Sequence, residues 1–207
     1  RITQFSESVP RKIEEALQEL SEKEVEGIIL DLRNNSGGLV SSGIAVADCF
    51  LNKKLVVETK NRDGIKDSII SQEETSFNGP MVTLVNNGTA SASEILAGAL
   101  QDNERSALIG KQTYGKGLIQ SLKSLTDESG IAITVASYLT PKGHNIQGRG
   151  IIPDKILDLT EAKDFGSTED KWVKNAEIYL SSLLDKKDSD ENEISSKINV
   201  KEDSNII

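Results

Sequence analysis

Short apolar runs that alternate with helix-like segments are the strongest constraint on the fold of this chain. The runs GIILDL (27–32), MVTLV (81–85) and ALIG (107–110) hold few polar residues, which is typical of strands covered on both faces of a sheet. The segment SASEILAGALQD (91–102), between two of these runs, has apolar residues at helical spacing. Buried strands separated by helices predict an α/β domain.

The rest of the chain continues this pattern. Segment 6–23 is expected to be a helix, with Ser8 as its cap and Pro10 in its first turn. Segment 168–184 is expected to be an amphipathic helix. A further helix is expected at 41–51, and further strands at 1–5, 55–60, 67–72, 117–125 and 130–140.

Length and charge bound the organisation of the chain. Its 207 residues are enough for one compact domain. Its net charge of -9, from 24 Lys+Arg and 33 Asp+Glu, argues against nucleic acid or an anionic membrane surface as a partner. From Asp185 onward few residues are apolar and many are charged, which is typical of disorder. We therefore expect a core at 1–160, an amphipathic helix at 161–184 and a disordered acidic tail at 185–207.

Several kinds of site and segment are disfavoured by what the sequence lacks. The single cysteine, Cys49, cannot form an intrachain disulfide or a cysteine-built zinc site, and we expect it to be a small buried residue. No apolar run approaches the roughly 20 residues of a membrane-spanning helix. Because the chain opens at Arg1 rather than at methionine, we expect it to be a fragment or a processed form.

The stretch NNGTASASEIL (86–96) is the first candidate for chemistry. Ser91 and Glu94 fit the capping box S-x-x-E, so an ordinary helix cap would account for both residues. However, a serine between a strand and a helix lies where backbone N–H groups and the helix dipole can stabilise an oxyanion. The small neighbours Gly88, Ala90 and Ala92 leave room for a substrate chain. Ser91 is therefore either a cap or a nucleophile.

A serine nucleophile needs a base, and the chain offers two kinds. The single histidine, His144, lies in a glycine-rich loop and would need Asp31, Asp102 or Asp154 to complete a triad. A lysine is the alternative, but it acts as a base only if desolvation lowers its pKa from about 10.4 toward 7–8. Lys116, flanked by glycines and followed by an apolar segment, is the lysine best placed for this role.

The residues around these candidates resemble the signature of the carboxy-terminal processing proteases, also called tail-specific proteases. The resemblance lies in LVNNGTASASEILAGALQDNERSALIGKQTYGKGLIQSL, where Lys116 follows Ser91 by 25 residues and Gln120 follows Lys116 by 4. GIILDLRNNSGG and YLTPKGHNIQGRGIIPD are similar to two further blocks of this family, in the same order. The resemblance extends from Arg1 to about Asp158.

The resemblance implies a role for each matched residue. Ser91 would be the nucleophile, Lys116 the general base and Gln120 the residue that orients the lysine. The backbone N–H groups of Gly37 and Ala92 would form the oxyanion hole, which suits a glycine and the first turn of a helix. If the strand at 117–125 begins early enough, Lys116 and Gln120 would point to the same face.

Two nearby positions are given supporting roles. Ser93 is expected to point about 200° away from Ser91 around the helix. Ser93 and Glu94 are therefore assigned to packing and capping, and Asp102, which matches an acidic position of the family, to structural support.

By the same resemblance, the fold would be a crotonase/Clp-protease-like α/β spiral forming a single core domain. The chain would be a serine endopeptidase that cleaves protein substrates near unstructured C-terminal tails through an acyl-enzyme, with no metal or cofactor. Its compartment would be extracytoplasmic, in a periplasm or a thylakoid lumen. The family's PDZ domain is expected upstream and is absent from this chain. Two alternatives stay open: a crotonase-like enzyme that processes acyl-CoA, and an inactive peptide-binding core.

Overall fold

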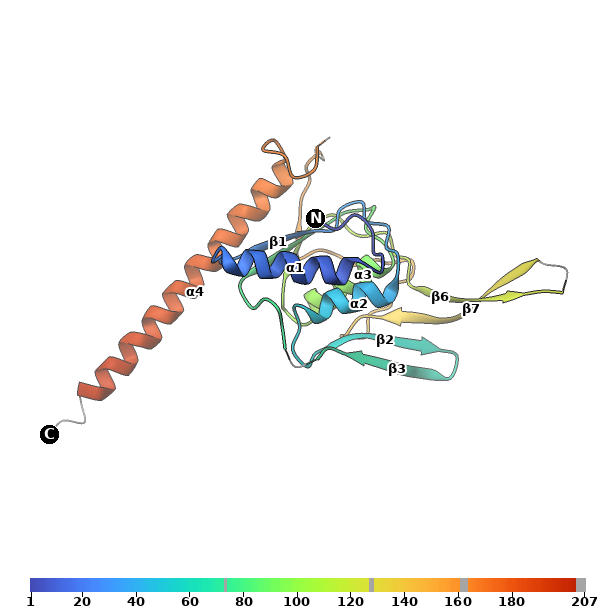
Figure 1. Ribbon diagram of the computed structural model, residues 1–207, viewed down its shortest axis with the longest axis horizontal. Coiled ribbons are helices and arrows are strands. Elements are labelled where there is room, and N and C mark those ends of the chain that lie inside the picture. The colour runs from blue at the N-terminus through green and yellow to red at the C-terminus, as the bar shows by residue number, and fades with distance from the viewer. Residues whose placement is uncertain (73, 127–128, 161–163, 204–207) are drawn as a thin grey trace.

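Two four-stranded sheets organise the fold (Figure 1). The structure, a computed structural model, describes residues 1–207 except for 73, 127–128, 161–163 and 204–207. The first sheet is parallel, with the order β1-β4-β5-β8: β1 (Ile28–Asp31), β4 (Met81–Val85), β5 (Ala107–Gly110) and β8 (Lys155–Ile156). The second is antiparallel, with the order β3-β2-β7-β6: β2 (Leu55–Asn61), β3 (Gly64–Ile70), β6 (Leu118–Ser124) and β7 (Gly130–Leu139).

The parallel sheet has helices on both faces, which explains its unbroken apolar strands. Along β4, Met81 and Val85 join the core formed with α1 (Val9–Glu22), α2 (Val40–Asp48) and α3 (Ala92–Asp102). Val82 and Leu84 point the other way, into a second cluster with Trp172, Ala176 and Leu180 of α4 (Lys171–Asp203). Neighbouring strand residues alternate between faces, so a run buried throughout requires cover on both sides. The expected α/β class is confirmed.

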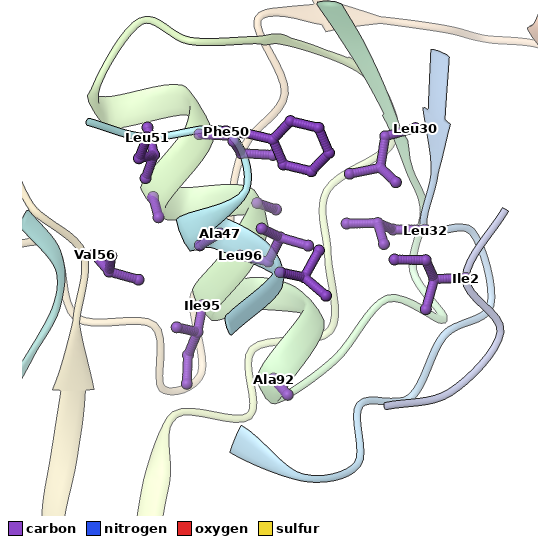
Figure 2. Packing of buried hydrophobic residues seen from close by; sticks show 14 of the residues in the cluster. Ile2, Leu30, Leu32, Ala47, Phe50, Leu51, Val56, Ala92, Ile95 and Leu96 are labelled. Atoms are coloured by element: carbon purple, nitrogen blue, oxygen red, sulfur yellow. The ribbon is translucent and has the colours of Figure 1, made fainter. Parts of the chain in front are cut away.

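The main core lies between the parallel sheet and the helices α2 and α3 (Figure 2). Figure 2 shows Leu30 and Leu32 on one side and Ala47 and Leu96 on the other, with Phe50 above them. Each of these side chains is at most 5% exposed. Because α3 begins directly after the loop that follows β4, this packing fixes the position of the helix N-terminus.

The antiparallel sheet is built from two hairpins that extend from the body (Figure 1). The expected strands at 55–60 and 67–72 correspond to β2 and β3, joined at the turn 61–64. Those at 117–125 and 130–140 correspond to β6 and β7. β6 begins immediately after Lys116 and Gly117, so the base of this hairpin lies beside the candidate site.

The C-terminal helix departs from expectation in two ways. Its first three turns bury Trp172, Ala176 and Leu180 against the parallel sheet, so the segment after residue 160 completes the core. The helix also continues to Asp203, through most of the segment for which composition predicts disorder. A helix nucleated by packed turns can extend at little further cost, because propagation adds a hydrogen bond for each residue fixed. In the described part of the chain, no helix combines the length and apolar character needed to cross a membrane.

Two smaller expectations have different outcomes. The strand expected at 1–5 is wrong: Phe5 makes one isolated bridge to Gly38, because its partner is a loop rather than a strand. Cys49 is buried, as expected, and burial raises the pKa of its thiol to about 11. It is therefore a packing residue and not a reactive thiol.

Candidate active site

Three loops meet at the carboxyl edge of the parallel sheet. They follow β1 (residues 32–39), β4 (86–91) and β5 (111–117), and the three strands are adjacent and parallel. Open α/β sheets place ligands at this edge because the carboxyl ends of their strands lie together. Three of the five site residues expected from sequence, Gly37, Ser91 and Lys116, lie in these loops. Ala92 is the first residue of α3, and Gln120 lies in β6.

Ser91 occupies a strained turn at the start of α3. Its backbone has φ 58° and ψ −119°, a conformation that a residue with a side chain rarely adopts. Such strain costs about 1–3 kcal/mol and persists only where the surroundings impose it. A sharp strand-to-helix turn with small neighbours is also the geometry that exposes the serine hydroxyl in the nucleophile elbow of the α/β-hydrolases. Ser91 is half-buried, whereas Ala90 and Ala92 on either side of it are buried.

The loop after β1 and the loop after β4 are joined by a close network of hydrogen bonds. The backbone N–H of Asn34 donates to Asn86 Oδ1, and Asn86 Nδ2 donates to Asn34 Oδ1, both at 2.8 Å. The carbonyl oxygen of Asn35 accepts from the Ala90 N–H at 2.9 Å and from Ser93 Oγ at 3.0 Å. Ser93 is thus buried and occupied, in agreement with its assignment to packing.

Gly37 lies directly against the turn that carries Ser91. Its φ is +104°, and a Cβ at this position would lie 2.8 Å from Ser91 Cβ and 3.1 Å from the Ala92 nitrogen, so only glycine fits. The two predicted oxyanion-hole residues are therefore neighbours. The Ala92 N–H, in the first turn of α3, has no acceptor within its own helix. The Gly37 N–H, however, donates to Asn35 Oδ1 at 2.9 Å.

Glu94 links Ser91 to the loop that carries Lys116. Its side chain is fully buried. One carboxylate oxygen, Oε2, accepts from the backbone N–H of Ser91 at 2.9 Å and from that of Lys116 at 2.8 Å. The other, Oε1, accepts from the Gly115 N–H at 2.7 Å and from Thr113 Oγ1. The capping assignment is correct but incomplete, because the same carboxylate also fixes the backbone of the predicted base.

The side chains of Lys116 and Gln120 are exposed in this structure. Within the described residues, no hydrogen bond joins Ser91 Oγ to Lys116 Nζ. β6 begins at Leu118, and its pairing with β7 shifts register between Ile119 and Gln120. The simple alternation that would place Lys116 and Gln120 on one face does not extend across this region. The structure therefore fixes the backbone of Lys116 and leaves its amine in contact with solvent.

Comparison with known proteins identifies the family. Residues 1–157 match the family model described as peptidase family S41. This chain belongs to peptidase family S41. Its S41 domain is 51% identical over 158 residues to a carboxyl-terminal-processing protease of Synechocystis, and 38% identical over 162 residues to a carboxy-terminal processing protease of Bacillus subtilis. These matches cover 76% and 78% of the chain, and 37% and 35% of the relatives.

A solved structure supports the same assignment. The photosystem II D1 C-terminal processing protease superposes with a TM-score of 0.74 at 43% identity, over 76% of this chain and 41% of that one. The expected family and its α/β fold are thus confirmed, and the family is one of serine-type peptidases. The chain spans little more than a third of the length of the curated relatives that it matches.

His144 is the alternative base considered for Ser91. Its side chain is exposed, and among the described residues its ring makes no hydrogen bond to Ser91. The carboxylates considered as its partners are engaged elsewhere. Asp31 binds Arg33, Asp102 accepts the Lys142 N–H at 2.8 Å, and Asp154 accepts the Leu108 N–H at 2.8 Å. The geometry thus offers no support for a histidine triad, and Asp102 has the structural role assigned to it.

Sequence reasoning did not find several residues that organise the S41 site. Asn35, the reach of Glu94 to Lys116, and the buried Arg33 act through contacts between loops that are distant in sequence. The one available signal was the polar run DLRNN directly after a buried strand. In the described part of the chain, no group of three or more His, Cys, Asp or Glu side chains is arranged to hold a metal ion.

Proposed function

We propose that this chain is the catalytic core of a serine endopeptidase that cleaves protein substrates near their C-termini. The observation that carries the proposal is the Glu94 carboxylate, which holds the backbone N–H groups of Ser91 and Lys116 on a single oxygen. A nucleophile and a base that act together must keep a fixed separation. Glu94 fixes the two residues at their backbones, and membership of a peptidase family supports peptide hydrolysis.

The proposed mechanism uses Ser91 and Lys116 in turn. The neutral amine of Lys116 takes the proton from Ser91 Oγ as this oxygen attacks the substrate carbonyl carbon. The developing oxyanion is stabilised by the N–H groups of Ala92 and Gly37. Lys116 then gives its proton to the leaving amine, and a water molecule activated by the same lysine hydrolyses the acyl-enzyme. Gln120 orients the lysine without supplying a charge that would keep it protonated.

The proposed mechanism requires two features of this structure to change. The Lys116 amine is exposed and must be covered to work as a base near neutral pH. The Gly37 N–H is held by Asn35 Oδ1 and must leave it to bind an oxyanion. We propose that a bound substrate chain covers the lysine and converts the site to its active form, and that a PDZ domain of a longer protein strengthens this effect.

A second candidate function is an inactive core that only binds peptides. The exposed Lys116 and the occupied Gly37 N–H favour it for this chain on its own. The acyl-CoA alternative is less well supported, because the chain belongs to a peptidase family.

Substrate class and compartment are proposed from the relatives. Those that match include C-terminal processing peptidases of chloroplasts and of cyanobacteria. We therefore propose protein substrates with unstructured C-terminal tails and an extracytoplasmic location, in a thylakoid lumen or a periplasm.

The test measures both labelling and cleavage. A fluorophosphonate probe is applied to the chain and to Ser91→Ala, and cleavage of an unfolded protein is followed from neutral to mildly alkaline pH. We expect labelling that Ser91→Ala abolishes, activity that rises with pH, and a loss of ~10²–10⁴-fold in Lys116→Ala. Ser181→Ala and Lys174→Ala, exposed residues on α4, serve as matched controls.

Three results would count against this assignment. Intact activity in Lys116→Ala together with loss in His144→Ala would replace the dyad with a histidine triad. Specific peptide binding without labelling would favour the inactive core. Affinity for coenzyme A without peptidase activity would favour the acyl-CoA alternative.

A further inference from the structure

A short segment outside the family match binds the base of the catalytic loops. We call residues 165–172 the latch; they follow the part of the chain that matches the S41 model. Asp170 of the latch is fully buried and forms a two-pronged ion pair with Arg33, from Nη1 to Oδ1 at 3.1 Å and from Nη2 to Oδ2 at 2.7 Å. Arg33 is also fully buried and forms a second such pair with Asp31. The guanidinium thus joins β1 to the latch.

The latch is organised around this one charge. The Asp170 carboxylate also accepts the N–H groups of Gly166 at 2.9 Å and Trp172 at 3.0 Å, so it closes the latch and begins α4 at the same time. The Phe165 ring centre lies 4.7 Å from the Arg33 guanidinium carbon and 4.2 Å from that of Arg1. Contacts of this kind are attractive because the ring face is negative. The ion pair and the ring contact thus hold the latch against the same guanidinium.

Arg33 lies on the same loop as Gly37, one of the two proposed oxyanion-hole residues. It precedes Asn35 by two residues, and the Asn35 side chain holds the Gly37 N–H while its carbonyl holds Ala90. A shift of Arg33 would therefore move the loop that presents Gly37 to Ser91.

Trp172 connects the latch to the lysine loop. A Cβ on Gly110 would lie 2.8 Å from the Trp172 ring, so the ring packs directly on the end of β5. The centre of the ring also lies 5.6 Å from the Arg33 guanidinium carbon and 5.7 Å from Lys111 Nζ. Lys111 opens the loop that continues to Lys116. The latch thus touches the base of two of the three catalytic loops.

We propose that the latch sets the catalytic loops through Arg33, with Asp170 as a positioning residue for the reaction. When Asp170 is in place, Arg33 is held from two sides and the loop keeps Gly37 against Ser91, so only the Gly37 N–H has to turn from Asn35 Oδ1 to the oxyanion. When it is lost, Arg33 keeps Asp31 as its partner, so the domain stays folded while the loop gains freedom and acylation slows. This inference rests on the proposed function.

A purely structural latch would behave differently. It would lower the melting temperature and leave the reactivity of Ser91 unchanged at temperatures well below melting. A positioning latch lowers the maximal rate of Ser91 labelling, while the probe concentration that gives half of this rate changes little. It also increases amide hydrogen exchange in residues 34–38.

The decisive variant is Asp170→Asn, which keeps the shape of the side chain and removes its charge. Its matched control is Glu177→Gln, an exposed carboxylate on the same helix. We measure fluorophosphonate labelling and hydrogen exchange for both variants and for the unaltered chain. We expect Asp170→Asn to slow labelling about 10-fold or more and to speed exchange at 34–38 by a similar factor, with Glu177→Gln close to the unaltered chain.

The outcomes separate this inference from the proposed function. If the unaltered chain is not labelled, the proposed function fails and hydrogen exchange alone decides on the latch. Unchanged exchange at 34–38 in folded Asp170→Asn would overturn the latch. If Asp170→Asn does not fold, Phe165→Leu takes its place, since it removes the ring contact and leaves the ion pair.

Discussion

Replacing the Glu94 carboxylate with an amide tests the centre of the site. Four donors converge on this side chain: Ser91 N–H and Lys116 N–H on one oxygen, Gly115 N–H and the Thr113 hydroxyl on the other. A carboxylate suits this setting because it only accepts. In Glu94→Gln, one of the two oxygens becomes an NH₂ group that faces two donors.

The structure indicates which arrangement Glu94→Gln would adopt. With its NH₂ toward Ser91 and Lys116, two backbone N–H groups would lose their acceptor. With its NH₂ toward Thr113, the hydroxyl, which already accepts the Ile151 N–H, can accept a second bond by turning its own proton away, and only one backbone N–H, that of Gly115, is left facing a donor. One unsatisfied buried donor costs about 1–3 kcal/mol, and the remaining bonds lose their charge assistance. We expect a total loss of about 3–5 kcal/mol in the free energy of unfolding.

Chemical denaturation of Glu94→Gln and of the unaltered chain measures this loss directly, and fluorophosphonate labelling under native conditions measures the effect on Ser91. Glu177→Gln, exposed on α4, should change stability by less than about 0.5 kcal/mol. A Glu94→Gln variant with nearly unaltered stability and full labelling would refute the view that this carboxylate holds the proposed nucleophile, Ser91, and the proposed base, Lys116, together.

Three further predictions follow from single features. Gly37→Ala should abolish labelling and lower the free energy of unfolding by several kcal/mol, because its Cβ would lie 2.8 Å from Ser91 Cβ. The control Gly64→Ala, with a similar φ of +120° and open space around it, should lower the free energy of unfolding by only about 1 kcal/mol. Equal losses for Gly37→Ala and Gly64→Ala in chemical denaturation would contradict this prediction. Ser91→Gly should be about 1 kcal/mol more stable than Ser91→Ala, because glycine tolerates a φ of 58°; an equal melting temperature would argue against strain. Burial tends to raise the pKa of Asp170, but hydrogen bonds from Arg33 and from backbone N–H groups outweigh it and lower the pKa to about 2. The pair therefore contributes about 2 kcal/mol above pH 4, and this is lost as the pH falls toward 2. Acid titration of stability should show the loss in the unaltered chain and not in Asp170→Asn.

Local patterns predicted most of the elements and the strand-to-helix turn that carries Ser91. The apolar runs at β1, β4 and β5 are continuous because both faces of their sheet are covered, and this leaves a clear mark in the sequence. Ser91 could be singled out because its turn lies between a buried strand and a helix. The roles assigned to Ser91, Lys116, Gln120, Gly37 and Ala92 remain predictions for the labelling and cleavage experiments.

Contacts between distant segments could not be predicted in the same way. The S-x-x-E pattern indicates a cap, but the bonds from Glu94 to Gly115 and Lys116 span about twenty residues. The pairing of Arg33 with Asp170 spans 137 residues. The N-terminal segment failed as a strand because β propensity does not reveal whether a partner strand is within reach.

The helix that covers the second face of the parallel sheet bears on how this domain can vary. Val82, Leu84 and Ile109 belong to the family-matched region, yet Trp172, Ala176 and Leu180 that bury them lie beyond it. The unit that folds cooperatively is therefore larger than the unit defined by sequence similarity. A relative that shares the first unit must supply its own cover for this face, so the C-terminal segment is free to change its sequence but not to lose its apolar side.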